Sequence, residues 1–247
     1  MEKTGKKRLG LIGKDISYSF SQGYFTEKFN VMKIEGFSYE NFDLQNIEEI
    51  ASILKNPEVF GLNVTIPYKE QVLPYLDELD KTAQEIGAVN TIKFIDNKRI
   101  GFNTDTYGFK NSITPLLNIS HKNALILGTG GASKAIAYVF KTLGIAYTYV
   151  SRSAKPGQLS YIELDKEIIT SNTIIVNCSP VGTFPNVAEK PNIPYEYLGK
   201  NHVLFDLIYN PEVTAFLAEG KKKGCVVQNG YPMLVGQAEK AWEIWNS

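Results

Sequence analysis

A lysine follows an apolar run in the segment GLNVTIPYKE, residues 61–70. The apolar residues up to Val64 are typical of a buried strand, and Pro67 interrupts the run before Lys69. Two roles are open to Lys69: a solvated residue that opens a helix after Pro67, or an ammonium group at the end of a strand that faces a reacting molecule. In the second role, a lysine can take a proton from a hydroxyl group and return it, which is general acid–base chemistry.

A glycine-rich turn in ALILGTGGASKAIA, residues 124–137, is a second candidate site. Gly128, Gly130 and Gly131 join an apolar strand to an alanine-rich helix. Glycines let a pyrophosphate approach the backbone N–H groups at a helix N-terminus, whose dipole favours an anion. A tight turn without a ligand is the alternative, but strand, turn, helix and second strand come in the order of a dinucleotide-binding unit.

The end of that second strand indicates which nucleotide binds. NAD-binding units usually carry Asp or Glu there, whereas this chain has Ser151, Arg152 and Ser153. A carboxylate would repel a 2′-phosphate, while Arg152 can pair with it and stack on adenine. We therefore expect NADP as the cofactor, with an ordinary surface arginine as the alternative.

Composition limits the classes of partner. The 247 residues include 26 Lys and Arg against 26 Asp and Glu, so we expect small-molecule partners rather than nucleic acid or a membrane surface. No run is long enough for a signal-peptide core or a membrane span, which favours a cytoplasmic protein. Cys178 and Cys225 lack metal-ligand spacing, and His121 and His202 precede predicted strands, where we expect exposed loop residues. No metal site is expected.

Hydrophobic periodicity predicts two α/β units, the second at about residues 106–229. In the first unit we expect a strand and a helix around Lys69 and two strands joined at Asp96 and Asn97. The other expected segments are strands at 8–13, 37–44, 146–153, 173–179 and 202–209, helices at 23–29, 46–55, 104–117, 215–224 and 233–245, and a strand–turn–helix within 123–144.

A nicotinamide cofactor would require a proton-handling residue outside the glycine turn. The scarcity of histidine argues against dehydrogenases that use an Asp-His pair. A Tyr-xxx-Lys pair occurs only at Tyr24 and Lys28, far upstream of the turn and on a predicted amphipathic helix, so we interpret it as coincidence.

The chain resembles the shikimate dehydrogenase family in nine motifs that follow one another over nearly its whole length: GKDISYSFS, NVTIPYK, GAVNT, GFNTD, GTGGAS, SRS, NCSPVG, FDLIYNP and MLVGQA. The resemblance implies an α/β substrate-binding domain with a mostly parallel sheet, at 1–105 and 230–247. It also implies a Rossmann-like NADP-binding domain at 106–229. The implied activity is the NADP-dependent interconversion of shikimate and 3-dehydroshikimate in aromatic amino-acid biosynthesis. Its alternatives are a quinate or shikimate dehydrogenase with relaxed specificity and a non-catalytic binding protein.

The resemblance also assigns roles to individual residues. The implied catalytic pair is Lys69 and Asp105, although a helix cap is an ordinary role for such an aspartate. The implied substrate-binding residues, besides that pair, are Ser19 and Ser21 on the carboxylate, and Asn63, Thr65, Asn90 and Gln237. The implied cofactor-binding residues are Gly128, Gly130, Gly131, Ala132, Ser151, Arg152 and Ser153.

Other roles remain open for some of these residues. Ser19 and Ser21 could cap a helix. Gln237 lies on the apolar stripe of its predicted helix, where a substrate hydroxyl or a backbone carbonyl could satisfy the amide.

The sequence departs from the family at three positions. Tyr18 stands where histidine is common, and Asp15 where proline is common, so the carboxylate loop is expected to differ in shape. Pro156 falls near a second basic residue of many NADP-binding members, although Lys155 is adjacent. A monomer or a homodimer is expected.

Overall fold

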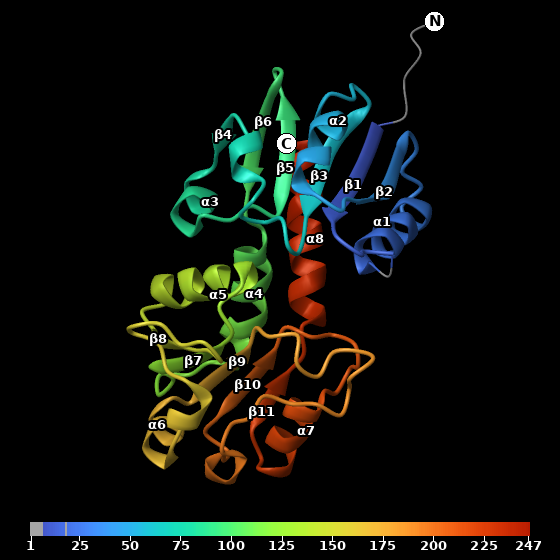
Figure 1. Ribbon diagram of the computed structural model, residues 1–247. Coiled ribbons are helices and arrows are strands. Elements are labelled where there is room, and N and C mark those ends of the chain that lie inside the picture. Colours follow the sequence, from blue (N-terminus) through green and yellow to red (C-terminus); the bar gives the residue numbers. More distant parts are fainter. Residues whose placement is uncertain (1–6, 18) are drawn as a thin grey trace, which may run out of the picture. The chain divides into compact units, whose positions relative to one another are not determined.

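The computed structural model describes residues 7–17 and 19–247, so the departure at Tyr18 lies outside the described residues. The chain forms two compact units: the described residues up to Thr104 together with Ala238–Ser247, and Asp105–Gln237. Helix α8 (Tyr231–Asn246) contributes residues to both (Figure 1). The assignment of substrate to one unit and NADP to the other stays a prediction.

The first unit alternates strands and helices over residues 7–86 and then forms an antiparallel hairpin. Its strands are β1 (Lys7–Gly13), β2 (Phe37–Asp43), β3 (Val59–Val64), β4 (Glu78–Leu79), β5 (Thr91–Ile95) and β6 (Lys98–Phe102). Its helices are α1 (Phe20–Val31), α2 (Ile50–Leu54) and α3 (Lys81–Ile86), with short 3₁₀ turns at Ile47–Glu49 and Leu73–Tyr75.

These strands form one sheet in the order β2-β1-β3-β5-β6-β4. β1 is parallel to β2 and β3, whereas β5 is antiparallel to β3 and β6. Apolar residues of α1 and α8 cover one face, where Phe25 and Trp245 are fully buried. Residues of α2 and α3, including Ile50 and Ala83, pack on the other face. Burial on both faces is why the central strands are almost continuously apolar.

The second unit is a parallel α/β unit. Its strands are β7 (Asn123–Leu127), β8 (Ala146–Val150), β9 (Ile174–Asn177), β10 (Val203–Asp206) and β11 (Val226–Gln228). Its helices are α4 (Asp105–Ile113), α5 (Gly131–Thr142), α6 (Lys166–Ser171), α7 (Ala215–Lys222) and the first part of α8, with 3₁₀ turns at Thr114–Leu116, Tyr161–Glu163 and Tyr195–Tyr197.

The strand order of this sheet is β11-β10-β9-β7-β8, and every neighbouring pair is parallel. Residues of α4, α5 and α8 pack on one face around Phe109 and Phe140. Residues of α6 and α7 pack on the other face around Ile169 and Phe216. The expected fold class, an α/β protein with a mostly parallel sheet and a Rossmann-like second unit, is confirmed.

The hairpin prediction is confirmed, and one helix prediction is wrong. Asp96 and Asn97 connect β5 to β6 with φ of 50° and 61°, a left-handed conformation that Asn and Asp tolerate in two-residue turns. The expected helix around Lys69 is instead a series of turns through residue 72. The Lys69 carbonyl accepts a hydrogen bond from Val89 N at 2.8 Å, so it is used by another segment rather than by a following helical turn.

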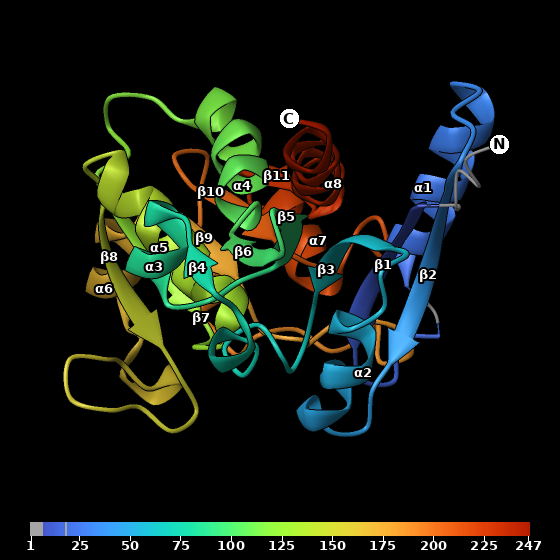
Figure 2. The ribbon, with the colours of Figure 1, turned by 90° about the horizontal axis from the view of Figure 1, so that it is seen from above.

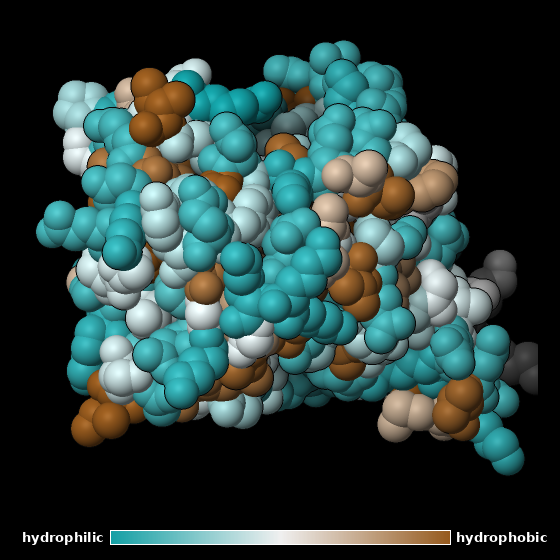
Figure 3. All heavy atoms as spheres, turned by 90° about the horizontal axis from the view of Figure 1, so that it is seen from below, coloured by the Kyte–Doolittle hydropathy of each residue, from teal (hydrophilic) through white to brown (hydrophobic). Residues whose placement is uncertain are grey.

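The exposed surface is of mixed polarity. On the face drawn in Figure 3, hydrophobic residues are scattered in small groups among hydrophilic ones. Among the described residues, no helix is both long and apolar enough to cross a membrane.

Candidate functional site

Most of the candidate substrate residues of the first unit lie at one edge of its sheet. Asn63, near the carboxyl end of β3, pairs with Leu11 near the end of β1 and with Thr91 at the start of β5. Thr91 in turn pairs with Phe102, the last residue of β6. The loops that carry Ser19, Lys69, Asn90 and Thr104 therefore leave or enter the same edge of the sheet.

A buried hydrogen-bond network connects the asparagines at this edge. Asn63 Nδ2 donates to Asn90 O at 3.2 Å and to Thr91 Oγ1 at 3.1 Å, so both of its amide hydrogens are used. Asn90 Oδ1 accepts from Thr104 N at 2.7 Å and from Thr104 Oγ1 at 3.1 Å. These bonds fix the two amides. Because both amide hydrogens of Asn63 are used, Asn63 can only accept a hydrogen bond from a substrate hydroxyl.

Sequence reasoning did not identify Tyr39, which connects this network to α1. Its hydroxyl donates to Asn63 Oδ1 at 2.8 Å and also shares a hydrogen bond with the Ser21 hydroxyl. Burial raises the pKa of Tyr39, so the phenol remains a neutral donor. The only signal that could identify Tyr39 is the pairing of β2 with β1, because this pairing places the Tyr39 ring on the core face beside Phe25.

The two candidate serines lie at the start of α1. Ser19 is the N-cap residue, and its Oγ accepts from Ser21 N at 3.2 Å. The Ser21 side chain is buried. The capping role is therefore present at Ser19, and the hydroxyl hydrogen of a capping serine remains able to donate to a carboxylate.

Asp15 adopts a conformation that the proline common in the family cannot. Its φ is +54°, whereas a proline ring holds φ near −65°. Its backbone N–H donates to Asp43 Oδ1 at 2.8 Å, and Ile16 N donates to Asp43 Oδ2 at 3.3 Å. The loop before Ser19 is thus anchored to the end of β2 through an N–H group that proline lacks.

Lys69 and Thr65 belong to the turns after β3. Thr65 N donates to Ile12 O at 2.8 Å, and Tyr68 N donates to Thr65 O at 2.9 Å. Tyr68 is buried and donates its hydroxyl to Leu44 O at 2.7 Å. These bonds fix the backbone on the N-terminal side of Lys69, whose own side chain is half-buried.

Asp105 and Gln237 belong to the second unit. Asp105 is the first residue of α4, where a carboxylate interacts favourably with the helix dipole, and it is 5% exposed. Gln237 is 8% exposed, and its Nε2 donates to Leu234 O at 3.0 Å, so a backbone carbonyl satisfies part of its amide. Asp105 directly follows Thr104 in the chain, and Thr104 N is held by Asn90 in the first unit.

The glycine turn has the geometry that a pyrophosphate requires. Gly128 has φ +113°, and a Cβ there would lie 3.2 Å from the backbone of Cys178, so the position requires glycine. Helix α5 starts after Gly130 without a side-chain cap, and a Cβ on Gly130 would meet nothing within 4 Å. An anion can therefore approach the first N–H groups of α5, which include that of Ala132.

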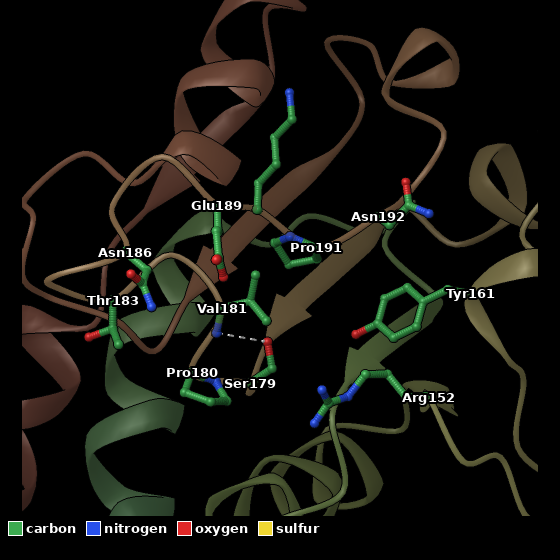
Figure 4. Close-up of a pocket in the computed structure, with 11 residues that line it drawn as sticks. Arg152, Tyr161, Ser179, Pro180, Val181, Thr183, Asn186, Glu189, Pro191 and Asn192 are labelled. Atoms are coloured by element: carbon green, nitrogen blue, oxygen red, sulfur yellow. Dashed lines mark hydrogen bonds between the residues drawn. The ribbon is translucent and has the colours of Figure 1, made fainter.

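A cavity of about 590 Å³ lies beyond the ends of β8 and β9 (Figure 4). Arg152 and Tyr161 line one side of it, and Pro180 and Val181 line another. Its remaining lining residues are Ser179, Thr183, Asn186, Glu189, Lys190, Pro191 and Asn192. A guanidinium and an aromatic ring beside proline and valine can enclose a planar heterocycle.

A smaller cavity of about 260 Å³ contains further cationic groups. Its lining residues are Thr129, Lys134, Tyr149, Ser153, Lys155 and Gln158. The loop after β8, which extends from the sheet in Figure 2, returns to pair Leu159 with Val150 and thereby brings Lys155 beside Tyr149. Sequence reasoning did not select Lys134, because only the closed loop shows that a helix residue and Lys155 share one cavity.

Together these features fit NADP better than NAD. The turn leaves helix N–H groups open to a pyrophosphate, and neither cavity has an acidic residue at the end of β8. Lys134, Lys155 and Ser153 offer two positive charges and a hydroxyl, which suit a phosphate group.

The expectation of exposed histidines is wrong. His121 is 6% exposed and His202 is 5% exposed. His121 Nδ1 accepts from Asn118 N at 2.9 Å, and His202 Nδ1 accepts from Gly199 N at 3.1 Å. Both rings close their own loops before strands β7 and β10, so their role is structural. Among the described residues, no cluster of His, Cys, Asp or Glu could hold a metal ion.

Comparison with known proteins covers nearly the whole chain. A model of the shikimate dehydrogenase substrate binding domain matches residues 11–92. Shikimate dehydrogenase (NADP(+)) of Methanococcus vannielii is 34% identical over 96% of this chain and 90% of the relative. That of Clostridium beijerinckii is 38% identical over the same shares. The crystal structure of shikimate 5-dehydrogenase from Thermus thermophilus, in complex with NADP(H) and shikimate, matches with a TM-score of 0.85 and 30% identity, over 96% of this chain and 92% of that one.

Proposed function

Because the chain belongs to the shikimate dehydrogenase family, we propose that it catalyses the NADP-dependent interconversion of shikimate and 3-dehydroshikimate. The observation that carries the proposal is the extent of the similarity, which reaches at least 96% of the chain in relatives with this name and so includes both units. The geometry of the glycine turn and of the two cavities supports the nucleotide part of the proposal.

In this proposal the edge of the first sheet holds shikimate. Ser19 donates its hydroxyl hydrogen to the carboxylate beside the N-terminus of α1, where the helix dipole favours an anion. Ser21 donates to the same carboxylate when its hydroxyl turns away from Tyr39. Thr65, Asn63, Asn90 and Gln237 contact the ring hydroxyls. The network that fixes Asn63 and Asn90 supports this role, since amides that are already fixed lose little entropy on binding.

Lys69 and Asp105 handle the proton. A bound NADP supplies the nicotinamide that accepts the hydride from the alcohol carbon. Lys69 takes the hydroxyl proton as the C–H bond breaks and returns it in the reverse reaction, and Asp105 orients the ammonium group. The turns after β3 fix the backbone beside Lys69, which supports a positioned base rather than a flexible surface residue.

The second unit holds the nucleotide. Gly128, Gly130, Gly131 and Ala132 present backbone groups to the pyrophosphate. The larger cavity receives the adenosine part beside Arg152, and Ser151, Ser153 and Lys155 contribute with Arg152 to binding of the 2′-phosphate. The linings of the two cavities support this placement of the adenosine and the 2′-phosphate, because Arg152 lines the larger cavity and Lys155 lines the smaller one.

A comparison of two acids and two cofactors tests the proposal. Turnover of shikimate and of quinate should be measured with NADP and with NAD. We expect shikimate with NADP to have the highest kcat/KM. Comparable values for quinate, or for NAD, would instead support the relaxed quinate or shikimate dehydrogenase.

We also propose small-molecule partners only, a cytoplasmic location and a monomer or homodimer. The balanced charge of the chain supports the first of these statements.

A further inference from the structure

Asp206, the last residue of β10, is a fully buried carboxylate that the proposed chemistry does not use. Its Oδ1 accepts from Asn177 Nδ2 at 3.0 Å and from Ile208 N at 3.1 Å. Its Oδ2 accepts from Thr214 Oγ1 at 2.6 Å. Burying a carboxylate is costly even when it is hydrogen-bonded, so its presence indicates a role beyond filling the core.

Asn177 is the partner of Asp206 in the register between β9 and β10, and it is also fully buried. Its Oδ1 accepts from Ser179 N at 3.0 Å and from Ser179 Oγ at 2.7 Å. Its Nδ2 donates to Val181 O at 3.3 Å as well as to Asp206. Every hydrogen-bonding group of this amide therefore has a partner.

Asp206 contributes to which way the Asn177 amide faces. Because the carboxylate only accepts, the NH₂ group must face Asp206 and the carbonyl must face Ser179. An amide turned the other way would direct its NH₂ group at Ser179 N–H and its carbonyl oxygen at Asp206 Oδ1, so it would lose the bonds to both groups. The buried charge thus reinforces the amide orientation that Ser179 N and Val181 O also favour.

The segment that Asn177 holds is a wall of the larger cavity. Ser179, Pro180, Val181 and Thr183 all line it. Val181 N donates to Ser179 Oγ at 3.4 Å, which closes the turn on the cavity side (Figure 4). The path from Thr214 through Asp206 and Asn177 to Ser179 runs through side chains that are hydrogen-bonded at every step.

We propose that Asp206 is a positioning residue of the nucleotide site. It fixes the amide of Asn177, and Asn177 fixes the Ser179–Val181 turn against which the adenosine part of the nucleotide packs. This inference rests on the proposed function, in which the larger cavity receives that part of NADP.

Three variants test the proposal through the dissociation constant of NADP. Asp206→Ala removes the acceptor, and Asn177→Ala removes the amide while leaving Asp206 its bonds to Ile208 and Thr214. Each should weaken NADP binding about tenfold, which is about 1.4 kcal/mol. Asp206→Asn can keep Oδ1 as the acceptor for Asn177 and turn its NH₂ group toward Thr214 Oγ1, so binding should stay within about twofold of wild type.

Thr214→Val is the matched control. It removes the bond to Asp206 Oδ2 and the cap of α7, where Leu217 N donates to Thr214 Oγ1, but no contact of Asn177. The melting temperature should fall while NADP affinity changes less than about twofold. In steady state, Asn177→Ala should raise the KM for NADP and leave the KM for shikimate unchanged. Asn177→Ala still tests the proposal if Asp206→Ala does not fold.

Three outcomes would overturn the proposal. The first is wild-type NADP affinity in Asn177→Ala, the second is a loss in Asp206→Asn equal to that in Asp206→Ala, and the third is an equal loss in Thr214→Val. If wild type turns shikimate over normally and one of these occurs, only the positioning role fails. If wild type binds no NADP, the proposed function fails as well.

Discussion

At the scale of single residues, the proposed chemistry depends most on Lys69. Lys69→Ala should lower turnover by about 10²- to 10⁴-fold with a smaller change in the KM for shikimate, because the residue transfers a proton in the transition state rather than adding uniform binding. Steady-state kinetics of the variant give both values. Lys81→Ala, at an exposed lysine that starts α3, is the control and should leave turnover unchanged. Near-normal turnover in Lys69→Ala would remove its assignment.

Arg152 tests the choice between the two nicotinamide cofactors. Arg152→Ala should weaken NADP by about 1.5–3 kcal/mol, the value of a hydrogen bond to a charged group, and should leave NAD nearly unchanged. The dissociation constants of both cofactors check this expectation. An equal loss for NADP and NAD would mean that Arg152 serves the adenine or the fold rather than the 2′-phosphate.

Residue types identified the candidate site but not its internal bonds. The sequence predicts that Asn63 and Asn90 contact a substrate. The structure adds that Asn63 bonds to Asn90 and that Asn90 bonds to Thr104. Tyr39 and Lys134 could not be identified from the sequence, because each acts together with a residue that is distant in sequence. Tyr39 bonds to Asn63, and Lys134 shares a cavity with Lys155. Such pairs follow from strand register and loop closure, which periodicity does not determine.

At the scale of elements, the start of α1 combines a cap with the proposed carboxylate site. Ser19→Ala should lower stability by about 0.5–2 kcal/mol, since its Oγ caps the helix. Both Ser19→Ala and Ser21→Ala should also raise the KM for shikimate more than they lower turnover, because carboxylate contacts are similar in ground and transition states.

The methyl ester of shikimate separates the two roles. Wild type should prefer the acid strongly, and each variant should lose part of that preference. Melting temperatures measured in parallel report the loss of the cap. An acid-to-ester ratio that is unchanged in both variants would restrict the serines to a structural role.

Elements with strong local signals were predicted, and those set by distant contacts were not. The turn at Asp96 and Asn97 and the strand–turn–helix at Gly128 follow from residues that tolerate positive φ and from clear apolar periodicity. The helix expected around Lys69 does not form, because the Lys69 carbonyl accepts a hydrogen bond from Val89 N, about twenty residues away in sequence.

At the scale of the whole molecule, the buried Asp206 should affect stability against pH. Burial raises its pKa from 3.8 to about 6, so the native state holds the proton more tightly than the unfolded chain. The stability that this group contributes is fully present below about pH 4 and is lost as pH rises toward about 6. Relative to Asp206→Asn, which cannot titrate, wild type should lose up to about 3 kcal/mol of unfolding free energy over that window.

Urea unfolding of both proteins at a series of pH values measures this difference. Groups common to the two proteins cancel in the comparison. A difference that stays constant between about pH 4 and pH 6 would contradict the raised pKa.

The α/β class and the presence of two units could be predicted because alternating apolar segments restart after residue 105. The histidines show the limit of such reasoning, since His121 and His202 precede strands in sequence yet fold back and bond to backbone groups of their own loops. The cavities could not be predicted from the sequence, because their linings combine the loop after β8 with α5 or with the segment after β9.

The central claim is that this chain transfers hydride between NADP(H) and the shikimate skeleton. The most direct measurement mixes purified protein, NADPH and 3-dehydroshikimate and follows the absorbance of the reduced nicotinamide. We predict that NADPH is consumed in equal amount to the shikimate that is formed from 3-dehydroshikimate. Binding of both molecules without loss of that absorbance would contradict the account and would indicate a non-catalytic binding protein.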